Sequence, residues 1–408
     1  MKISYLSFVV SLMLLSCSKD YPYDEKDFNI YGGIGRTNAY EQFGSFPLQL
    51  ITDEPLVSED SSGVVQTPLR LKSPYFALAT SNGNILKINN STFEKSFNLG
   101  EKIIPAAGMA VDKNSNIYII ASDDKLYSIN NDFELNWIKE LPVKSSRALS
   151  YSDLLATVDG LYIGTNAGDI IKFDFDGNID WHYKSSLAVN KTFAADSLGN
   201  IYFPMTNNTF GETDSLLCLD KSGKEKWSHG LENVRILTST AFKNSRVFVG
   251  GSVDKDDERY GKLFCFDLSG NLIWASETTL PVRNISLDYD GNSYITSISS
   301  GVGEIQTGTL SFDFDGKERW RIYHGAAAVS PLMISDKYLA MSVITGAGAA
   351  VFYQRKSDGL FILNHSLANY PPMYLSPMVY DDATIRLYGS HKLSQIKLTQ
   401  TSLNKLIP

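Results

Sequence analysis

The sequence predicts an all-β fold, an eight-bladed β-propeller of four-stranded antiparallel blades, and repeated patterns along the chain predict it. The tryptophans recur at spacings of 44, 46, 47 and 46 residues, at Trp137, Trp181, Trp227, Trp274 and Trp320. A fixed period of about 20 to 50 residues indicates a repeat architecture, and four short strands per repeat are typical of a propeller blade.

Each tryptophan follows a predicted β-hairpin. In four repeats an apolar residue, an aspartate and then a glycine lead into the tryptophan strand, with the glycine four residues before the tryptophan, in segments 173–177, 219–223, 266–270 and 312–316. Glycine supplies the positive φ that a tight bend needs. A second turn signal lies upstream, in segments 112–118, 196–202 and 288–294. It predicts two further strands in each repeat.

The two ends of the chain are predicted to share one blade. Counting the last strand of each repeat gives seven blades, the seventh ending at 361–363, and three more strands follow at 374–380, 385–388 and 392–398. The apolar segment 46–51 supplies the missing outer strand, because an open ring would leave an unpaired sheet edge. A seven-bladed ring with an extra C-terminal hairpin is the alternative.

The N-terminus carries an export signal. Lys2 precedes an apolar stretch over 5–15 that is too short to span a bilayer but fits a signal-peptide core. The sequence Leu-Leu-Ser ending at Cys17 resembles the lipobox of bacterial lipoproteins, which implies a lipid anchor at Cys17. We therefore expect a signal peptide over 1–16, a lipidated tether over 17–45 and a single propeller domain over 46–408.

A charged stretch after the anchor, at 24–27, resembles export tags that send some Bacteroidetes lipoproteins to the outer leaflet. It implies an outer-membrane lipoprotein at the cell surface, with the periplasmic face as the alternative. The chain has 37 basic and 45 acidic residues, a net charge of −8, and no basic run. This removes the electrostatic basis for binding nucleic acid and argues against acidic or phosphate-rich partners.

The glycine and tryptophan repeats over 46–408 resemble those of quinoprotein-like (PQQ-type) propellers, including the propeller lipoproteins of the outer-membrane β-barrel assembly machinery. The resemblance implies that each tryptophan docks between neighbouring blades as a structural contact. Quinoprotein enzymes hold their quinone near calcium and often on a vicinal cysteine pair, which this chain lacks. A quinoprotein-type oxidoreductase is thus the weaker alternative. We expect no cofactor and no enzymatic activity.

The two remaining cysteines and the turn aspartates are predicted to have structural roles in the repeat. Cys218 and Cys265 occupy equivalent places in consecutive blades, too far apart for a disulfide, so both are expected to be free buried thiols. The closely spaced aspartates at 174–178 and 313–316 suggest a calcium loop. Equivalent residues fill hairpin turns in the other repeats, however, and no glutamate follows at the EF-hand spacing. The histidines form no metal motif, so no metal is expected.

The candidate binding site lies where the chain returns from one blade to the next. His182, His229, His324 and His365 are predicted to lie just after outer strands, on the same face as three long loops at 207–214, 253–260 and 299–308. Loops on a rigid scaffold commonly carry function. The candidate ligand-binding residues are Asp257, Arg259, Tyr260, Arg321, Tyr323 and His324.

These observations predict a non-enzymatic, surface-anchored monomer that binds a protein or glycan partner through the long-loop face. The alternative is a periplasm-facing scaffold in outer-membrane protein assembly. The candidate residues could also be ordinary solvated loop residues.

Overall fold

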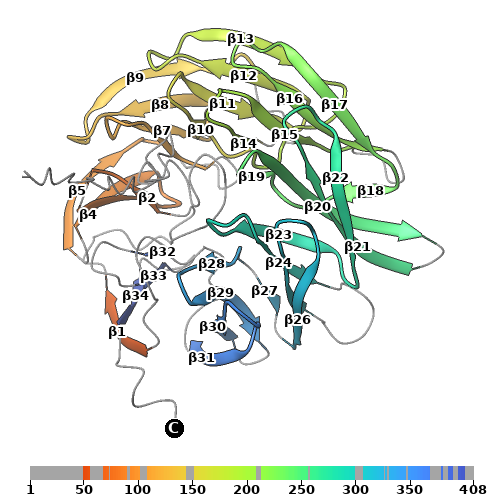
Figure 1. Ribbon diagram of the computed structural model, residues 1–408. Helices are drawn as coiled ribbons and strands as arrows, with labels where there is room; N and C mark the ends of the chain where they lie inside the picture. Colours follow the sequence, from red (N-terminus) through yellow and green to blue (C-terminus); the bar gives the residue numbers. More distant parts are fainter. Residues whose placement is uncertain are drawn as a thin grey trace, which may run out of the picture.

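A computed structural model describes residues 49–55, 68–72, 74–89, 92–101, 108–143, 151–207, 213–255, 258–298, 307–325, 327–328, 330–345, 348–367, 378–379, 385–388 and 394–399. Within these ranges the regular elements are all strands, paired antiparallel in eight sheets. The described residues include no helix able to cross a membrane. The sheets follow one another around a centre in chain order (Figure 1). The predicted all-β propeller is confirmed.

The first three sheets each contain four consecutive strands. The bounds are β2 Leu69–Arg70, β3 Tyr75–Ala79, β4 Asn84–Asn89 and β5 Thr92–Asn98; β6 Ala110–Val111, β7 Ile117–Ile120, β8 Lys125–Ile129 and β9 Leu135–Glu140; β10 Leu155–Ala156, β11 Leu161–Gly164, β12 Asp169–Phe173 and β13 Ile179–Lys184.

The next four sheets continue the pattern, and two of them contain a fifth short strand. The bounds are β14 Ala194–Ala195, β15 Ile201–Met205, β16 Asp214–Leu219 and β17 Glu225–Leu231; β18 Val234–Ile236, β19 Ala241–Lys243, β20 Arg246–Lys255, β21 Glu258–Phe266 and β22 Leu272–Thr278; β23 Val282–Leu287, β24 Ser293–Ile298, β25 Thr307–Phe312 and β26 Glu318–His324; β27 Ala327–Ala328, β28 Met333–Ile334, β29 Tyr338–Thr345, β30 Gly348–Arg355 and β31 Phe361–Leu367.

The eighth sheet joins the two ends of the chain. Its order is β1-β34-β33-β32, with bounds β1 Gln49–Pro55, β32 Met378–Val379, β33 Ile385–Tyr388 and β34 Ser394–Thr399. β1 pairs antiparallel with β34 from Gln49 opposite Thr399 to Pro55 opposite Ser394. The predicted pairing of an N-terminal outer strand with three C-terminal strands is confirmed. The strand lies at 49–55 rather than 46–51, and residues 1–48 lie outside the described part.

Burial follows the position of each strand within its sheet. Every residue of the middle strands β11 and β12 is buried, whereas exposed and half-buried residues alternate along the outer strand β13. Middle strands are covered on both faces by neighbouring sheets, so they are mostly apolar. The two charged residues of β12, Asp169 and Lys172, form ion pairs with Lys184 and Asp159. The core thus lies between sheets: one cluster combines Ile120 and Leu126 from one sheet with Leu161 and Ile171 from the next.

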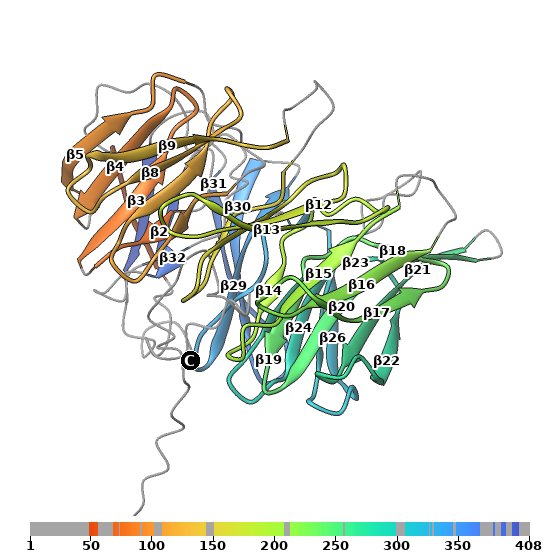
Figure 2. The ribbon, with the colours of Figure 1, turned by 90° about the horizontal axis from the view of Figure 1, so that it is seen from above.

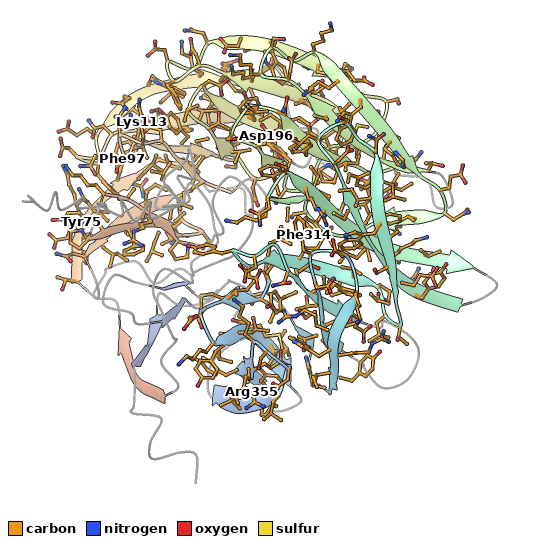
Figure 3. All side chains as sticks on the ribbon, in the orientation of Figure 1. Tyr75, Phe97, Lys113, Asp196, Phe314 and Arg355 are labelled. Carbon is orange, nitrogen blue, oxygen red and sulfur yellow. The ribbon has the colours of Figure 1, made fainter. Side chains whose placement is uncertain are left out.

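The tryptophans connect five of the sheets to the sheet that follows. Each indole Nε1–H donates to a backbone carbonyl in the hairpin turn of the following sheet: Trp137 to Phe175 at 3.0 Å, Trp181 to Lys221 at 3.0 Å, Trp227 to Leu268 at 3.0 Å, Trp274 to Phe314 at 3.2 Å and Trp320 to Lys356 at 3.1 Å. Phe314, labelled in Figure 3, is one such turn residue. The docking implied by the family resemblance is therefore present at five sheet junctions.

The glycine of each hairpin turn lies against the same indole ring. A Cβ on Gly270 would lie 2.6 Å from a ring carbon of Trp227, and one on Gly316 would lie 2.4 Å from Trp274. Gly270 also has a φ of +84°, a conformation that L-residues adopt only with strain. We call this contact the tryptophan–glycine lock. It explains why glycine occupies this turn in the five sheets that follow a tryptophan-bearing sheet.

Replacing Gly270 with alanine should destabilise the protein beyond the cost of its positive φ. We expect the free energy of unfolding to fall by about 2 to 4 kcal/mol, because a methyl group would both strain the backbone and displace the Trp227 ring. Denaturant unfolding followed by circular dichroism measures the change.

Gly100→Ala is the matched control. Gly100 has a φ of +75°, but no atom lies within 4 Å of its would-be Cβ. It should lose only about 1 kcal/mol. Equal losses of unfolding free energy in the two variants would show that the contact with Trp227 adds nothing to the cost of Gly270→Ala.

Candidate functional site

A cavity of about 260 Å³ lies where the sheet of β18–β22 meets the sheet of β23–β26. Its lining residues come from β18, β20, β21, β23 and the adjoining connections: Arg235, Leu237, Ser252, Arg259, Pro281 and Arg283. Three of the six are arginines. The cavity is therefore strongly cationic, although the chain as a whole is acidic.

A β-bulge places Arg283 in this cavity. Val282 pairs with Ser297 and Asn284 pairs with Thr296, so Arg283 has no partner residue across the sheet. Such a bulge bends the strand and changes the direction of a side chain. On β18, Val234 and Ile236 are buried while Arg235 between them is exposed, as the alternation of side chains along a strand requires.

Glycines let the strands around the cavity approach closely. A Cβ on Gly251 would lie 2.0 Å from the carbonyl oxygen of Arg235, and one on Gly261 would lie 2.2 Å from that of Leu280. Neither position has room for a side chain. These glycines allow β18 and the connection at 279–281 to lie against β20 and β21, which project beyond the neighbouring strands (Figure 2).

The arginines of the cavity differ in their partners. Arg259 Nε donates to Asp254 Oδ1 at 2.6 Å, and its Nη2 donates to Asp254 Oδ2 at 3.3 Å. This pairing raises the pKa of Arg259. Arg283, by contrast, has a buried Nε with no hydrogen-bond partner among the described residues. Burial lowers the pKa of Arg283, and the charges of Arg259 and Arg235 lower it further.

Lys191 and Asp214 are two further charged residues whose pKa values are affected by the cavity arginines. Burial lowers the pKa of Lys191, as do Arg283 and Arg235, while Asp214 opposes the shift. The carboxylate of Asp214 accepts hydrogen bonds from the backbone N–H of Asn207 at 2.7 Å and of Ile236 at 2.6 Å. Burial nevertheless raises the pKa of Asp214. Its oxygens thus accept from the backbone, while the nearby charges of Arg235 and Lys191 act in the opposite direction to burial and favour the ionised carboxylate.

The residues predicted from the sequence fall into separate groups. Arg259 lies in the cavity, Asp257 lies outside the described residues, and Tyr260 is half-buried against the core cluster that contains Val253. His324 is also half-buried and meets the ring of Phe352 edge-on at 5.5 Å between ring centroids. Tyr260 and His324 thus take part in packing, and only Arg259 of these residues lines the cavity.

Arg321 and Tyr323 lie on the outer strand β26, beside the connection that contributes Pro281 to the cavity. Arg321 pairs with Glu318, and its guanidinium also donates to the Thr279 hydroxyl. Tyr323 Oη donates to Thr279 Oγ1 at 2.8 Å while its side chain stays 47% exposed. This pair provides an exposed surface next to the cavity.

The predicted loop at 253–260 is wrong. Pairing between β20 and β21 continues from Val253 opposite Tyr260 to Lys255 opposite Glu258, so the segment is a hairpin of two long strands. The segment is polar because these strand ends project beyond their neighbours, which removes the apolar pattern of a buried strand. Most of the other two predicted loops, residues 208–212 and 299–306, lie outside the described part.

The predicted position of the histidines is also wrong. His182, His229 and His324 lie within the outer strands β13, β17 and β26, and His365 lies within β31. These strands continue past the tryptophan position because the strands beside them are equally long: His182 pairs with Ile171 and His229 with Leu216.

Two cavity arginines were missed by the sequence reasoning. Arg235 and Arg283 both follow a valine just after an outer strand, and they are 48 residues apart, close to one repeat. That spacing is the signal that could have found them, because equivalent positions of consecutive repeats lie on neighbouring sheets.

The turn aspartates are engaged by their own hairpins. Asp174 Oδ1 accepts from the backbone N–H of Asp176 at 3.0 Å and of Asn178 at 2.7 Å, and its Oδ2 accepts from Asn178 Nδ2 at 2.9 Å. Asp196, labelled in Figure 3, makes the same contacts in the other kind of turn. Turn chemistry thus accounts for these carboxylates.

Cys218 and Cys265 are free and buried, as predicted, opposite Trp227 and Trp274. Burial raises the pKa of each thiol to about 12. Because the thiolate is the reactive form, both should resist iodoacetamide at pH 8 in the folded protein and react quickly in guanidinium. Mass spectrometry of the labelled peptides measures this. Rapid alkylation of either cysteine in the native protein would contradict the buried position.

No protein-family model and no curated protein sequence matches this chain. Solved structures do. BamB from Moraxella catarrhalis superposes with a TM-score of 0.62 at 16% identity, covering 87% of this chain and 98% of BamB. The Dos1 propeller superposes with a TM-score of 0.63 at 12% identity, covering 87% of this chain and 96% of that one. The chain is therefore a β-propeller whose fold resembles that of BamB.

Proposed function

We propose that this protein is a non-enzymatic binding propeller, tethered to the outer membrane by a lipid on Cys17 and exposed at the cell surface. It binds a protein or glycan partner as a monomer through its cavity face. We define the cavity face as the arginine cavity, the projecting ends of β20 and β21, and the connection at 279–281 with Arg321 and Tyr323. Residues 17–45 act as the tether and 46–408 as the propeller.

The arginine cavity is the observation that carries this proposal. It combines charged and exposed polar groups at one end of two neighbouring sheets, where the backbone is held rigidly by the tryptophan–glycine locks. The opposite ends of the same sheets carry hairpin turns whose aspartates are engaged by their own backbones. A partner therefore finds more unsatisfied polar chemistry on the cavity face.

The chemistry of the cavity favours binding over catalysis. Its six lining residues are three arginines, one serine, a leucine and a proline. Ser252 is the single hydroxyl among them, and a nucleophilic serine needs a general base within hydrogen-bond reach. Arginines at this density recognise and hold anionic groups.

A periplasm-facing scaffold in outer-membrane protein assembly is the second candidate. The likeness of fold to BamB favours it, together with the sequence resemblance to propeller lipoproteins of the barrel-assembly machinery. Fold alone does not decide between the two, because one scaffold can host many functions.

Protease treatment of intact cells separates the two candidates. We expect the protein to be digested from the outside while a periplasmic marker stays intact, because a surface receptor must face outward. Blotting follows both proteins. Protection until the outer membrane is opened would overturn the surface placement and favour the assembly scaffold.

Site-specific photocrosslinking tests the cavity face. A photoreactive amino acid in place of Tyr323 should capture a partner in living cells, since this side chain is exposed beside the cavity. The same probe at Ser269, exposed in the hairpin turn at the opposite end of β21 and β22, is the control. Capture at Ser269 and not at Tyr323 would place the interaction on the other face.

A further inference from the structure

We propose that the arginine cavity binds a carboxylate, and that an acidic side chain of a protein partner supplies it. The inference rests on the proposed binding function and assigns the chemistry of the ligand. Composition argued against acidic partners, because the chain carries a net charge of −8. That average does not describe a cavity in which three arginines converge.

One donor of the cavity lacks an acceptor within the part of the chain that the structure describes. Arg283 Nε is buried and has no hydrogen-bond partner among the described residues. A buried donor without an acceptor is costly, and the cost is larger for a charged group. The bulge at Arg283 keeps its side chain in this position, so an acceptor from outside the chain can complete its hydrogen bonds.

The carboxylates described near the cavity already accept hydrogen bonds from other groups. Asp254 uses both oxygens on Arg259, and Asp214 uses both on backbone N–H groups. The Asp214 charge partly offsets the repulsion that Lys191 and Arg235 experience. Arg283, in contrast, is affected by burial and by the like charges of Arg259 and Arg235, and no carboxylate opposes them. An incoming carboxylate would relieve this repulsion and accept charge-assisted hydrogen bonds.

The size and lining of the cavity suit a carboxylate on a short amino-acid side chain. Leu237 and Pro281 provide an apolar wall that suits the short aliphatic stem of an aspartate or glutamate. Among the described residues that line it, none is an aromatic ring on which a sugar could stack. A volume of about 260 Å³ is at the small end for a ligand pocket and fits a side chain. Arg235 is exposed, so the cavity is accessible from solvent.

Calorimetric titration of the full-length protein in detergent with a Glu-Gly repeat peptide tests the inference. Both this peptide and its Gln-Gly control are acetylated and amidated at their ends, so that no terminal carboxylate competes. We expect binding that weakens with salt, no binding of the matching Gln-Gly peptide, and at least about tenfold weaker binding in Arg283→Gln and in Arg235→Gln. Arg355→Gln is the control, because this arginine pairs with Asp358 in a hairpin turn of another sheet; Figure 3 labels Arg355.

Thermal unfolding without ligand provides a second readout that does not depend on affinity. Arg283→Gln should then melt at a higher temperature than the wild type, because one of the repelling charges is gone. A given concentration of the Glu-Gly peptide should raise the melting temperature of the wild type more than that of the variant. A lower melting temperature for Arg283→Gln without ligand would overturn the argument from repulsion.

Four outcomes would overturn the assignment. The first is no binding of the Glu-Gly peptide, and the second is unchanged binding in both arginine variants. Binding of oligoglucuronate without the peptide would instead identify a glycan ligand, and equal saturation by inorganic phosphate would identify a free-anion site. If a partner is captured at Tyr323 despite any of these results, the proposed function stands and only the carboxylate assignment fails. If the peptide binds but no partner is captured, the carboxylate site stands and the proposed function fails.

Discussion

The contact between each tryptophan and the hairpin glycine of the next sheet is the interaction on which the structure depends. A sheet of four short strands is apolar on both faces and cannot be stable alone, so every sheet needs its neighbours. The indole supplies a large apolar surface, and its Nε1–H fixes the angle by bonding one carbonyl, as Trp227 does with Leu268. Glycine is required opposite because a methyl group would enter the ring.

Closing the ring imposes a second constraint. The sheet that holds β32, β33 and β34 obtains its outer strand from β1, more than 330 residues earlier in the chain. This pairing covers a sheet edge that would otherwise be open. It also ties both ends of the propeller together, so fraying at either end must break the same sheet.

The arginine cavity is a consequence of this architecture. It lies at the junction between the sheets of β18–β22 and β23–β26, and the locks of Trp227 and Trp274 hold these sheets to their neighbours. Like charges that are brought together by such packing cannot separate without disturbing the sheets. The cavity thus keeps an unfavourable charge arrangement that an anionic partner can neutralise.

The sequence by itself determined the repeat, the four-stranded order of the blades and the joining of the ends, because these depend on local turn chemistry and on a period that is visible in the chain. The family resemblance implied that the tryptophans dock between blades, but only the structure showed that each ring lies on the hairpin glycine of the next sheet. The sequence also determined that Cys218 and Cys265 stay unpaired. Only the tertiary structure decided which cations meet, since Arg235, Arg259 and Arg283 come from three strands of two sheets. A one-residue bulge re-aims Arg283, and the long pairing of β20 with β21 turns an expected loop into strands. Both depend on contacts between strands, which a single sequence does not display.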